Sequence, residues 1–253
     1  MCYYKSILPT PDIKKYNDFL FIAAHTCDIE KAAGATVKKL TDAGKRVKFL
    51  ITTDSTSFLK NEPDHAKRRE IKQKEEMASG LLLGVKEIEF LDLTDTGRYD
   101  DGRMGELIED SIYAFQPDVV FMDDDTTPNE ILMDDKRTTK EALKAVERVR
   151  NPYLQEEKGR KKGKIKAIAF YNTTRPNYYY GVTGAIGAKV NAVMLHRSLL
   201  PTKEEEIFRY MQTYKNLAMR TAFATGCKGG KLLAEGFRVL GCGAMHNVPQ
   251  INR

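Results

Sequence analysis

Strand and helix patterns alternate along most of the chain. Short apolar runs typical of buried strands cover residues 18–24, 46–53, 85–93, 117–124 and 165–172. Helical spacing of apolar residues covers 29–44, 66–84, 104–116 and 135–150, and two more helices are expected around 185–197 and 203–224. The residues after 224 are rich in glycine and are predicted to be irregular. Because strands that alternate with helices form βαβ units, we expect an α/β fold, a Rossmann-like three-layer sandwich with a mainly parallel sheet.

At 253 residues the chain is long enough for one large domain or two small ones. Because no linker divides it, we expect a single domain over residues 1–253. The chain is 42% hydrophobic and 30% charged, as is usual for globular proteins, and it contains no internal repeat or linker. No apolar run approaches the ~20 residues that a membrane helix needs, and the N-terminal segment lacks the apolar stretch of a signal peptide. The four cysteines have no paired spacing, which predicts reduced thiols. We therefore expect a cytoplasmic protein with no membrane partner.

The net charge of +6 is modest, and much of the basic excess lies in one run, KGRKKGKIK, at residues 158–166. No aromatic residues alternate with these lysines, and no nucleic-acid-binding motif accompanies them. The run is interpreted as a solvated loop before a strand, and no nucleic-acid partner is expected. A homo-oligomer is compatible with the sequence, which does not decide the oligomeric state.

The first predicted strand ends at a histidine, in the stretch FLFIAAHTCDIEKAAG at residues 19–34. Ligands of parallel sheets bind at the carboxyl ends of the strands, which is where His25 is expected. Asp28 follows three residues later, across the turn into a helix, and an imidazole beside a carboxylate suits a metal ion. Alternatively, Asp28 is the N-cap of a helix that begins at Ile29. Local spacing leaves both interpretations open.

The order of motifs along the chain resembles that of the LmbE-like, or PIG-L, family of zinc-dependent N-acetylglucosamine deacetylases. The matching segments are A-H-x-x-D at 24–28, AGKRVKFLITTD at 43–54, LLLGV at 81–85, EFLDLTDTGRYDDG at 89–102, PDVVFMDDD at 117–125, MDDKRTTKEALKAV at 133–146, AKVNAVMLHRS at 188–198 and LAEGFR at 233–238. They span nearly the whole chain. The resemblance implies a metal-dependent hydrolase of linear amides.

The resemblance implies a set of three metal ligands. His25 and Asp28 occupy the metal positions of the family's A-H-P-D-D-E motif. The third ligand, the second histidine of the family's H-p-D-H-r motif, corresponds to Asp135. The first histidine of that motif is replaced by Leu132, and its aspartate is kept as Asp134. The expected cofactor is one divalent metal ion, with zinc favoured by the resemblance, although a second carboxylate ligand also suits manganese or iron.

Cys27 stands where the family has its general base, an aspartate. A thiol accepts a proton only as thiolate, and its unperturbed pKa is about 8.5. Three interpretations remain open: a thiolate base activated by the cation, a sulfur ligand that frees Asp28 to act as base, or a small buried residue in a site that no longer hydrolyses amides.

Further candidate site residues follow from the same resemblance. His196 matches the family histidine that stabilises the oxyanion, although a lone histidine on a helix is also compatible with a core role. Lys72 corresponds to the family's substrate-contacting arginine, and Glu75 to its glutamate. Two more candidates rest on position alone, since Asp95 lies just after one predicted strand and Asp124 at the end of another. Both are candidates for contacts with the substrate, and Asp124 is alternatively a group that supports the site or part of a solvated loop.

Two functions are therefore considered. The first is an N-deacetylase acting on an N-acetylglucosamine-like compound or amino-sugar conjugate, a small-molecule substrate. The second is a non-hydrolytic or repurposed family member that binds a sugar-like ligand or uses Cys27 in different chemistry. A dinucleotide-binding oxidoreductase is disfavoured, because the first strand ends in H-x-x-D instead of G-x-G-x-x-G.

Overall fold

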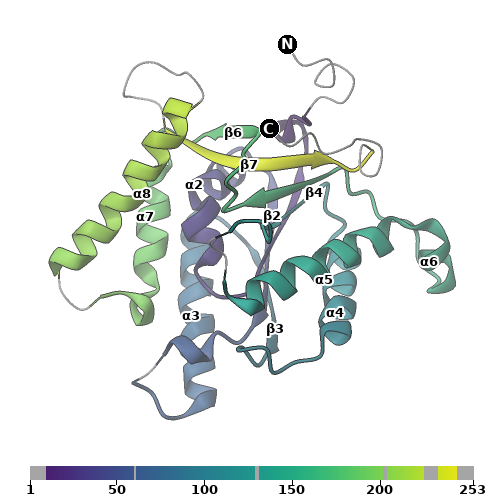
Figure 1. Ribbon diagram of the computed structural model, residues 1–253, viewed down its shortest axis with the longest axis horizontal. Coiled ribbons are helices and arrows are strands. Elements are labelled where there is room, and N and C mark those ends of the chain that lie inside the picture. Colours follow the sequence, from purple (N-terminus) through teal and green to yellow (C-terminus); the bar gives the residue numbers. More distant parts are fainter. Residues whose placement is uncertain (1–9, 60, 129–130, 202–203, 225–232, 244–253) are drawn as a thin grey trace.

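The computed structural model describes residues 10–59, 61–128, 131–201, 204–224 and 233–243 (Figure 1). Its centre is a seven-stranded sheet with the order β3-β2-β1-β4-β5-β7-β6. The strands are β1 (Asp18–Ala23), β2 (Arg46–Thr53), β3 (Glu87–Leu93), β4 (Val119–Asp123), β5 (Ala167–Tyr171), β6 (Tyr178–Gly181) and β7 (Ala234–Gly241). The five strands predicted from the sequence are all present and run parallel to one another, which confirms the expected α/β class.

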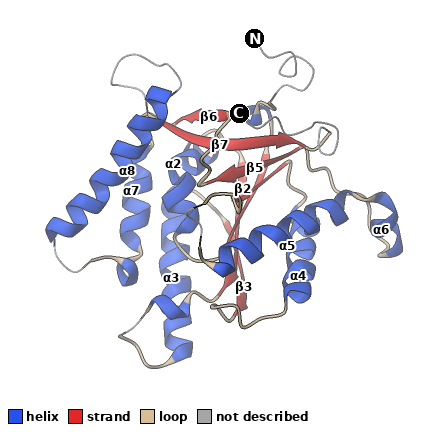
Figure 2. Cartoon of the chain, viewed as in Figure 1, coloured by secondary structure: helices blue, strands red, loops and turns tan. Residues whose placement is uncertain are grey.

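The helices agree closely with the predicted ones (Figure 2). They are α2 (Asp28–Asp42), α3 (His65–Leu83), α4 (Asp101–Phe115), α5 (Met133–Arg150), α6 (Pro152–Glu157), α7 (Ile186–Leu195) and α8 (Glu204–Ala224), with 3-10 turns η1 (Ile13–Lys15), η2 (Thr56–Phe58) and η3 (Arg197–Leu199). The short helix α6 and the strand β6 were not predicted. In the described part of the chain, no helix is both long and apolar enough to cross a bilayer.

The prediction of an irregular segment after residue 224 is wrong for residues 234–241, which form β7. This strand pairs antiparallel with β5 and β6. Phe237 and Val239 are buried in the core, so the alternation of the strand is real although Gly236 and Gly241 obscure it in the sequence. Cys2, Cys227 and His246 lie outside the described residues.

The sheet has a separate apolar core on each face, because alternate residues of a strand point to opposite sides. In β1, Phe19 and Phe21 pack beneath α2 and α7, whereas Leu20 and Ile22 pack beneath α4 and α5. Aromatic rings tighten the first core, where Phe21 stacks on Phe121 with centroids 4.2 Å apart. Helices therefore cover both faces, as expected for parallel strands.

The strand order places a reversal point at β1. The chain passes from β1 to β2 and β3 on one side, and then returns to β4 on the other side of β1. Connections that leave in opposite directions open a crevice at the carboxyl ends of the two central strands, which is the usual ligand position in such sheets. His25 follows β1 at this point, and α5 begins after β4 at the same edge.

Candidate active site

The turn between β1 and α2 brings Asp28 back to the strand end. Cys27 has φ +74°, in the left-handed region, and α2 begins at Asp28 itself. The Oδ2 atom of Asp28 accepts a hydrogen bond from the backbone N of His25 at 3.2 Å. The alternative interpretation of Asp28 as a helix N-cap is therefore wrong, because Cys27 occupies the cap position and no side chain caps this helix.

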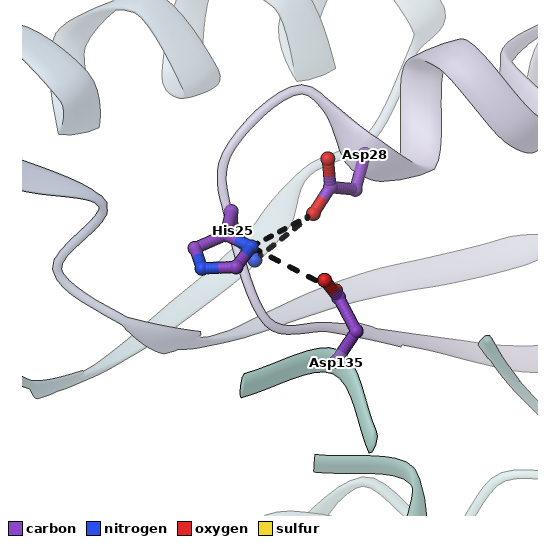
Figure 3. A group of neighbouring side chains, drawn as sticks. All are labelled: His25, Asp28 and Asp135. Carbon is purple, nitrogen blue, oxygen red and sulfur yellow. Dashed lines mark hydrogen bonds and ion pairs between the residues drawn. The ribbon is translucent and has the colours of Figure 1, made fainter. Parts of the chain in front are cut away.

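Three predicted metal ligands lie together at the carboxyl edge of the sheet (Figure 3). His25 Nδ1 is 3.4 Å from Oδ2 of Asp28 and 3.7 Å from Oδ1 of Asp135. One ligand atom from each residue lies within 4.8 Å of the others. We refer to His25, Asp28 and Asp135 as the His25 cluster. The first turns of two helices, α2 and α5, supply its carboxylates, while the end of β1 supplies its imidazole.

Asp134 fixes the ring of His25 from the opposite side. Its Oδ2 atom lies 3.4 Å from Nε2 of His25. The carboxylate also accepts hydrogen bonds from the backbone N of Thr96 at 2.7 Å and of Gly97 at 2.9 Å, and from the hydroxyl of Tyr99 at 2.7 Å. Burial opposes ionisation of Asp134, but these contacts outweigh it and lower its pKa to about 2. An anion held in this way favours a proton on Nε2 and leaves Nδ1 for a metal ion.

The donor set of the His25 cluster fits one divalent cation. It offers one imidazole nitrogen and two carboxylates, a combination found with zinc and with harder divalent metals. Burial opposes protonation of His25, yet the hydrogen bonds that its imidazole donates to the carboxylates of Asp134, Asp135 and Asp28 raise its pKa well above the usual value. The cluster therefore attracts a positive charge. A proton supplies that charge in the metal-free protein, and a metal ion competes with the proton.

Cys27 lies beside this cluster without joining it. Its side chain is 1% exposed, and its backbone N donates to Oε2 of Glu76 at 2.9 Å. Burial raises the pKa of the Cys27 thiol well above its ordinary value, and the neighbouring carboxylates of Glu30 and Glu76 act in the same direction. Among the described residues, the sulfur belongs to neither group of potential metal ligands. A catalytic role for this thiol stays a prediction.

His196 lies in a second, fully buried group. Its Nε2 atom is 3.3 Å from Oε1 of Glu30 and 3.7 Å from Oε2 of Glu76. All three side chains are 0% exposed. We refer to Glu30, Glu76 and His196 as the His196 cluster. The alternative of a core histidine fits this burial, and the predicted contact with an oxyanion stays untested.

Lys72 is buried close to the same region. Its Nζ atom donates to Oγ of Ser198 at 2.8 Å, and Ser198 in turn binds Glu75 through its backbone N at 2.8 Å and its hydroxyl at 2.6 Å. Burial lowers the pKa of Lys72. These contacts tie α3 to the segment that follows α7. Contact between Lys72 and a substrate remains a prediction.

The other two candidate substrate contacts are held by bonds within the protein. Asp95 accepts hydrogen bonds from the backbone N of Ser57 at 2.8 Å and from its hydroxyl at 2.6 Å. Asp124 accepts from Nη2 of Arg238 at 2.8 Å and from the hydroxyl of Thr173 at 2.6 Å. Burial opposes ionisation of Asp124, but hydrogen bonds from Arg238, Thr126 and Thr173, together with the charge of Arg238, outweigh it and lower the pKa to about 2. Both carboxylates therefore stabilise loops at the sheet edge, and their contact with substrate stays a prediction.

Sequence reasoning missed several groups of this region. The support of Asp134 by Tyr99 was not foreseen, although Tyr99 lies within the matching segment EFLDLTDTGRYDDG. Glu76 was also missed, and Glu30 was given no role of its own, although it lies in the stretch that follows His25. They lie on different helices, and no local spacing relates them to His196, so only the tertiary structure brings them together.

Known proteins share both the sequence and the fold of this chain. The chain is 29% identical over 235 residues to a diacetylchitobiose deacetylase of Thermococcus kodakarensis, covering 91% of this chain and 84% of the relative. The structure of an N,N'-diacetylchitobiose deacetylase from Pyrococcus horikoshii in complex with its inhibitor superposes with a TM-score of 0.83 at 28% identity, covering 94% of this chain and 89% of that one.

The fold alone is shared more widely. A 4-carboxy-2-hydroxymuconate hydratase from Pseudomonas putida superposes with a TM-score of 0.73 at 17% identity, covering 94% of this chain and 98% of that one. The family model for GlcNAc-PI de-N-acetylase matches residues 20–146, which include the whole His25 cluster. The resemblance seen in the sequence is thereby confirmed, and the chain belongs to the GlcNAc-PI de-N-acetylase (PIG-L) family.

Proposed function

We propose that this protein is a metal-dependent N-deacetylase that removes acetyl groups from N-acetylglucosamine-like amino sugars. The observation that supports it most is the His25 cluster, three potential ligands within 4.8 Å of one another at the reversal point of the sheet. Relatives that match this chain over most of its length are deacetylases of diacetylchitobiose. The substrate of this chain is inferred from that likeness.

The residues of the site have separate roles in this proposal. His25, Asp28 and Asp135 would hold one divalent cation, which supplies a Lewis acid that polarises an amide carbonyl and acidifies water. Zinc is the first candidate, and the two carboxylates also suit manganese or iron. Asp134 holds the imidazole in one orientation through Nε2. Asp28 has the most exposed side chain of the cluster, 22% against 6% and 7%, so it is the carboxylate nearest to solvent and to an incoming substrate.

The proposal is tested by measuring acetate release from N,N'-diacetylchitobiose and from N-acetylglucosamine with added Zn²⁺ or Mn²⁺. We expect acetate from the wild-type protein and none above background from His25→Ala. The matched control is His65→Ala, since His65 lies at the surface of α3 and pairs with Asp54 at 3.0 Å. The control should keep full activity. No acetate from a wild-type protein that has bound metal would refute the proposal.

One observation favours the second candidate, a family member that binds an amino sugar without hydrolysing it. Cys27 replaces the family's general base, and its buried thiol has a raised pKa, so it holds its proton near neutral pH. This candidate predicts that N-acetylglucosamine raises the unfolding temperature of the protein while no acetate appears. Release of acetate by the wild-type protein would exclude it.

A further inference from the structure

The His196 cluster is a second group of potential metal ligands, separate from the His25 cluster. Glu30 lies in the first turn of α2, Glu76 in the middle of α3, and His196 directly after α7. One ligand atom from each lies within 4.8 Å of the other two. The three side chains are 0% exposed, so no part of the group is solvated from outside.

The charge of the His196 cluster is not balanced by the protein. In the described part of the chain, no lysine or arginine pairs with Glu30 or Glu76 at ion-pair distance. His196 lies close to both carboxylates, and the charge of Lys31 acts on Glu76 without such a pair. Even with the imidazole protonated, one negative charge remains. An uncompensated charge in a protein interior is strongly unfavourable.

Several ligand atoms of the cluster are also unused. Oε2 of Glu30 and Oε1 of Glu76 are buried without a hydrogen-bond partner among the described residues, and so is Nδ1 of His196. Native proteins rarely leave buried polar atoms unpaired. Because Nδ1 of His196 has no partner among the described residues, the neutral imidazole can carry its proton on Nδ1. The lone pair of Nε2 then points toward the two carboxylates.

We propose that the His196 cluster binds a structural divalent cation. Two carboxylates and a neutral imidazole neutralise a divalent ion, and the second oxygen of each carboxylate gives it further ligands. Zn²⁺ and Mn²⁺ both accept this combination of nitrogen and oxygen ligands. Since the group is closed to solvent, the ion enters while the chain folds. It joins three helical segments that are distant in the sequence.

The proposed ion is linked to the His25 cluster through the start of α2. Glu76 accepts the backbone N–H of Cys27 at 2.9 Å, and Asp28 is the next residue. Ser79 on α3 also donates to Glu30. An ion that fixes Glu30 and Glu76 therefore fixes the turn that presents Asp28. This site does not depend on the proposed deacetylase activity, since none of its ligands belongs to the His25 cluster.

The experiment is metal analysis of protein expressed with added Zn²⁺ or Mn²⁺ and then dialysed against metal-free buffer. We expect about two divalent ions per wild-type chain and about one in both His25→Ala and Glu76→Gln, because each variant removes a ligand of a different site. The matched control is Glu75→Gln, the neighbouring position on α3, which binds Ser198 and should keep both ions.

A second measurement covers the case in which Glu76→Gln fails to fold. Anomalous scattering from crystals of the wild-type protein at the metal edge should show a peak among Glu30, Glu76 and His196. The absence of that peak, or a wild-type stoichiometry of one ion that His25→Ala abolishes, would overturn the proposal and assign the cluster to a proton shared by its carboxylates. A peak here with no ion at the His25 cluster would instead count against the deacetylase proposal alone.

Discussion

Cys27 occupies a left-handed backbone position, at φ +74°, between the strand and the helix that form the site. Aspartate and asparagine adopt this conformation more readily than most residues, so the family's aspartate suits the backbone here. Its side chain would, however, join a buried region that already contains Glu30, Glu76 and Asp28, whose charges already act on the thiol. The replacement of aspartate by cysteine removes a charge from a crowded anionic site.

Substitution of Cys27 by aspartate should affect the rate of hydrolysis and the stability of the fold in opposite directions. If the missing base limits hydrolysis, Cys27→Asp should raise the rate of acetate release on the order of 10²-fold, the low end for a general base, while lowering the unfolding temperature through carboxylate repulsion. Cys27→Ser, which adds no charge, should do neither. Rates are compared on N,N'-diacetylchitobiose with added Zn²⁺. A lower rate in both variants would instead show that the thiol itself takes part in the native activity.

Asp134 is expected to act on the metal through His25. Removing its charge by Asp134→Asn weakens the hold on Nε2, and loss of such an outer partner typically lowers metal affinity by about 10–100-fold. The measurement is competition with a chelating dye. Asp42→Asn, on the exposed side of α2, serves as the control and should leave the affinity unchanged. Equal affinities in all three proteins would contradict the positioning role of Asp134.

At the scale of elements, a buried ion pair joins α7 to β7, and both of its side chains also form hydrogen bonds with the backbone of α2. Lys189 Nζ lies 2.6 Å from Oε1 of Glu235. Glu235 also accepts the backbone N–H of Thr36 at 2.7 Å, and Lys189 donates to the backbone O of Ala32 at 3.4 Å. The Cβ of an alanine at Gly34 would lie 3.2 Å from Cγ of Lys189, so the absence of a side chain at Gly34 leaves room for the stem of Lys189.

Removing only one member of the Lys189–Glu235 ion pair should lower the free energy of unfolding. Lys189→Met leaves a buried carboxylate without its partner, for which the expected loss is about 3–5 kcal/mol in the free energy of unfolding. The double variant Lys189→Met with Glu235→Gln should lose less than the sum of the single losses, because the two side chains are coupled. Urea denaturation measures all three. Additive losses would mean that the pair contributes no coupling.

The strand β7, which lies between β5 and β6, is also held by Asp124 through Arg238. The pKa of Asp124 falls to about 2 in the folded protein, from an ordinary value of 3.8. A lowered carboxyl pKa stabilises the fold above pH 4, and this contribution disappears as the pH falls toward 2. The lowering of the Asp124 pKa from 3.8 to about 2 corresponds to about 2 kcal/mol in the free energy of unfolding.

Asp124→Asn should therefore be less stable than wild type at pH 6 by about 2 kcal/mol. The difference should shrink steadily as the pH falls from 4 toward 2. Urea denaturation between pH 6 and pH 2.5 provides the curve, with the exposed Asp42→Asn as a control that should show a much smaller change. A difference between the Asp124 variant and wild type that does not vary with pH would contradict the assignment.

The elements that were predicted from the sequence have a local apolar pattern, whereas those that were missed depend on residues far away along the chain. β1 and α2 have strong apolar periodicity of their own. β6 and β7 depend on each other, since Tyr180 pairs with Glu235 far along the chain. The residues of the site differ in the same respect. His25 and Asp28 are close in the sequence and could be predicted from local spacing, whereas Asp135 was predicted only from the family resemblance. The His196 cluster is formed by tertiary packing, which the sequence does not reveal.

For the whole molecule, the sheet positions the His25 cluster, but the packing of the sheet does not require a metal ion there. The two apolar cores lie on the faces of the strands, whereas the His25 cluster lies at their carboxyl ends. Removal of a metal ion from this edge exposes no core side chain. The strand order that reverses at β1 therefore provides a rigid frame, and the ligands on the first turns of α2 and α5 are brought together by the frame itself.

Chelation should accordingly lower the thermal stability of the protein without unfolding it. A metal ion present at about 100 times its dissociation constant stabilises the folded state by about 2.7 kcal/mol. For a chain of this size, each kcal/mol shifts the unfolding temperature by about 2–4 °C, so the expected decrease is about 5–10 °C. Far-UV circular dichroism at 25 °C should stay unchanged, and added Zn²⁺ should restore the transition. His25→Ala should lack this response at the His25 cluster, whereas unfolding of the wild-type protein by chelation at 25 °C would show that the metal is part of the core.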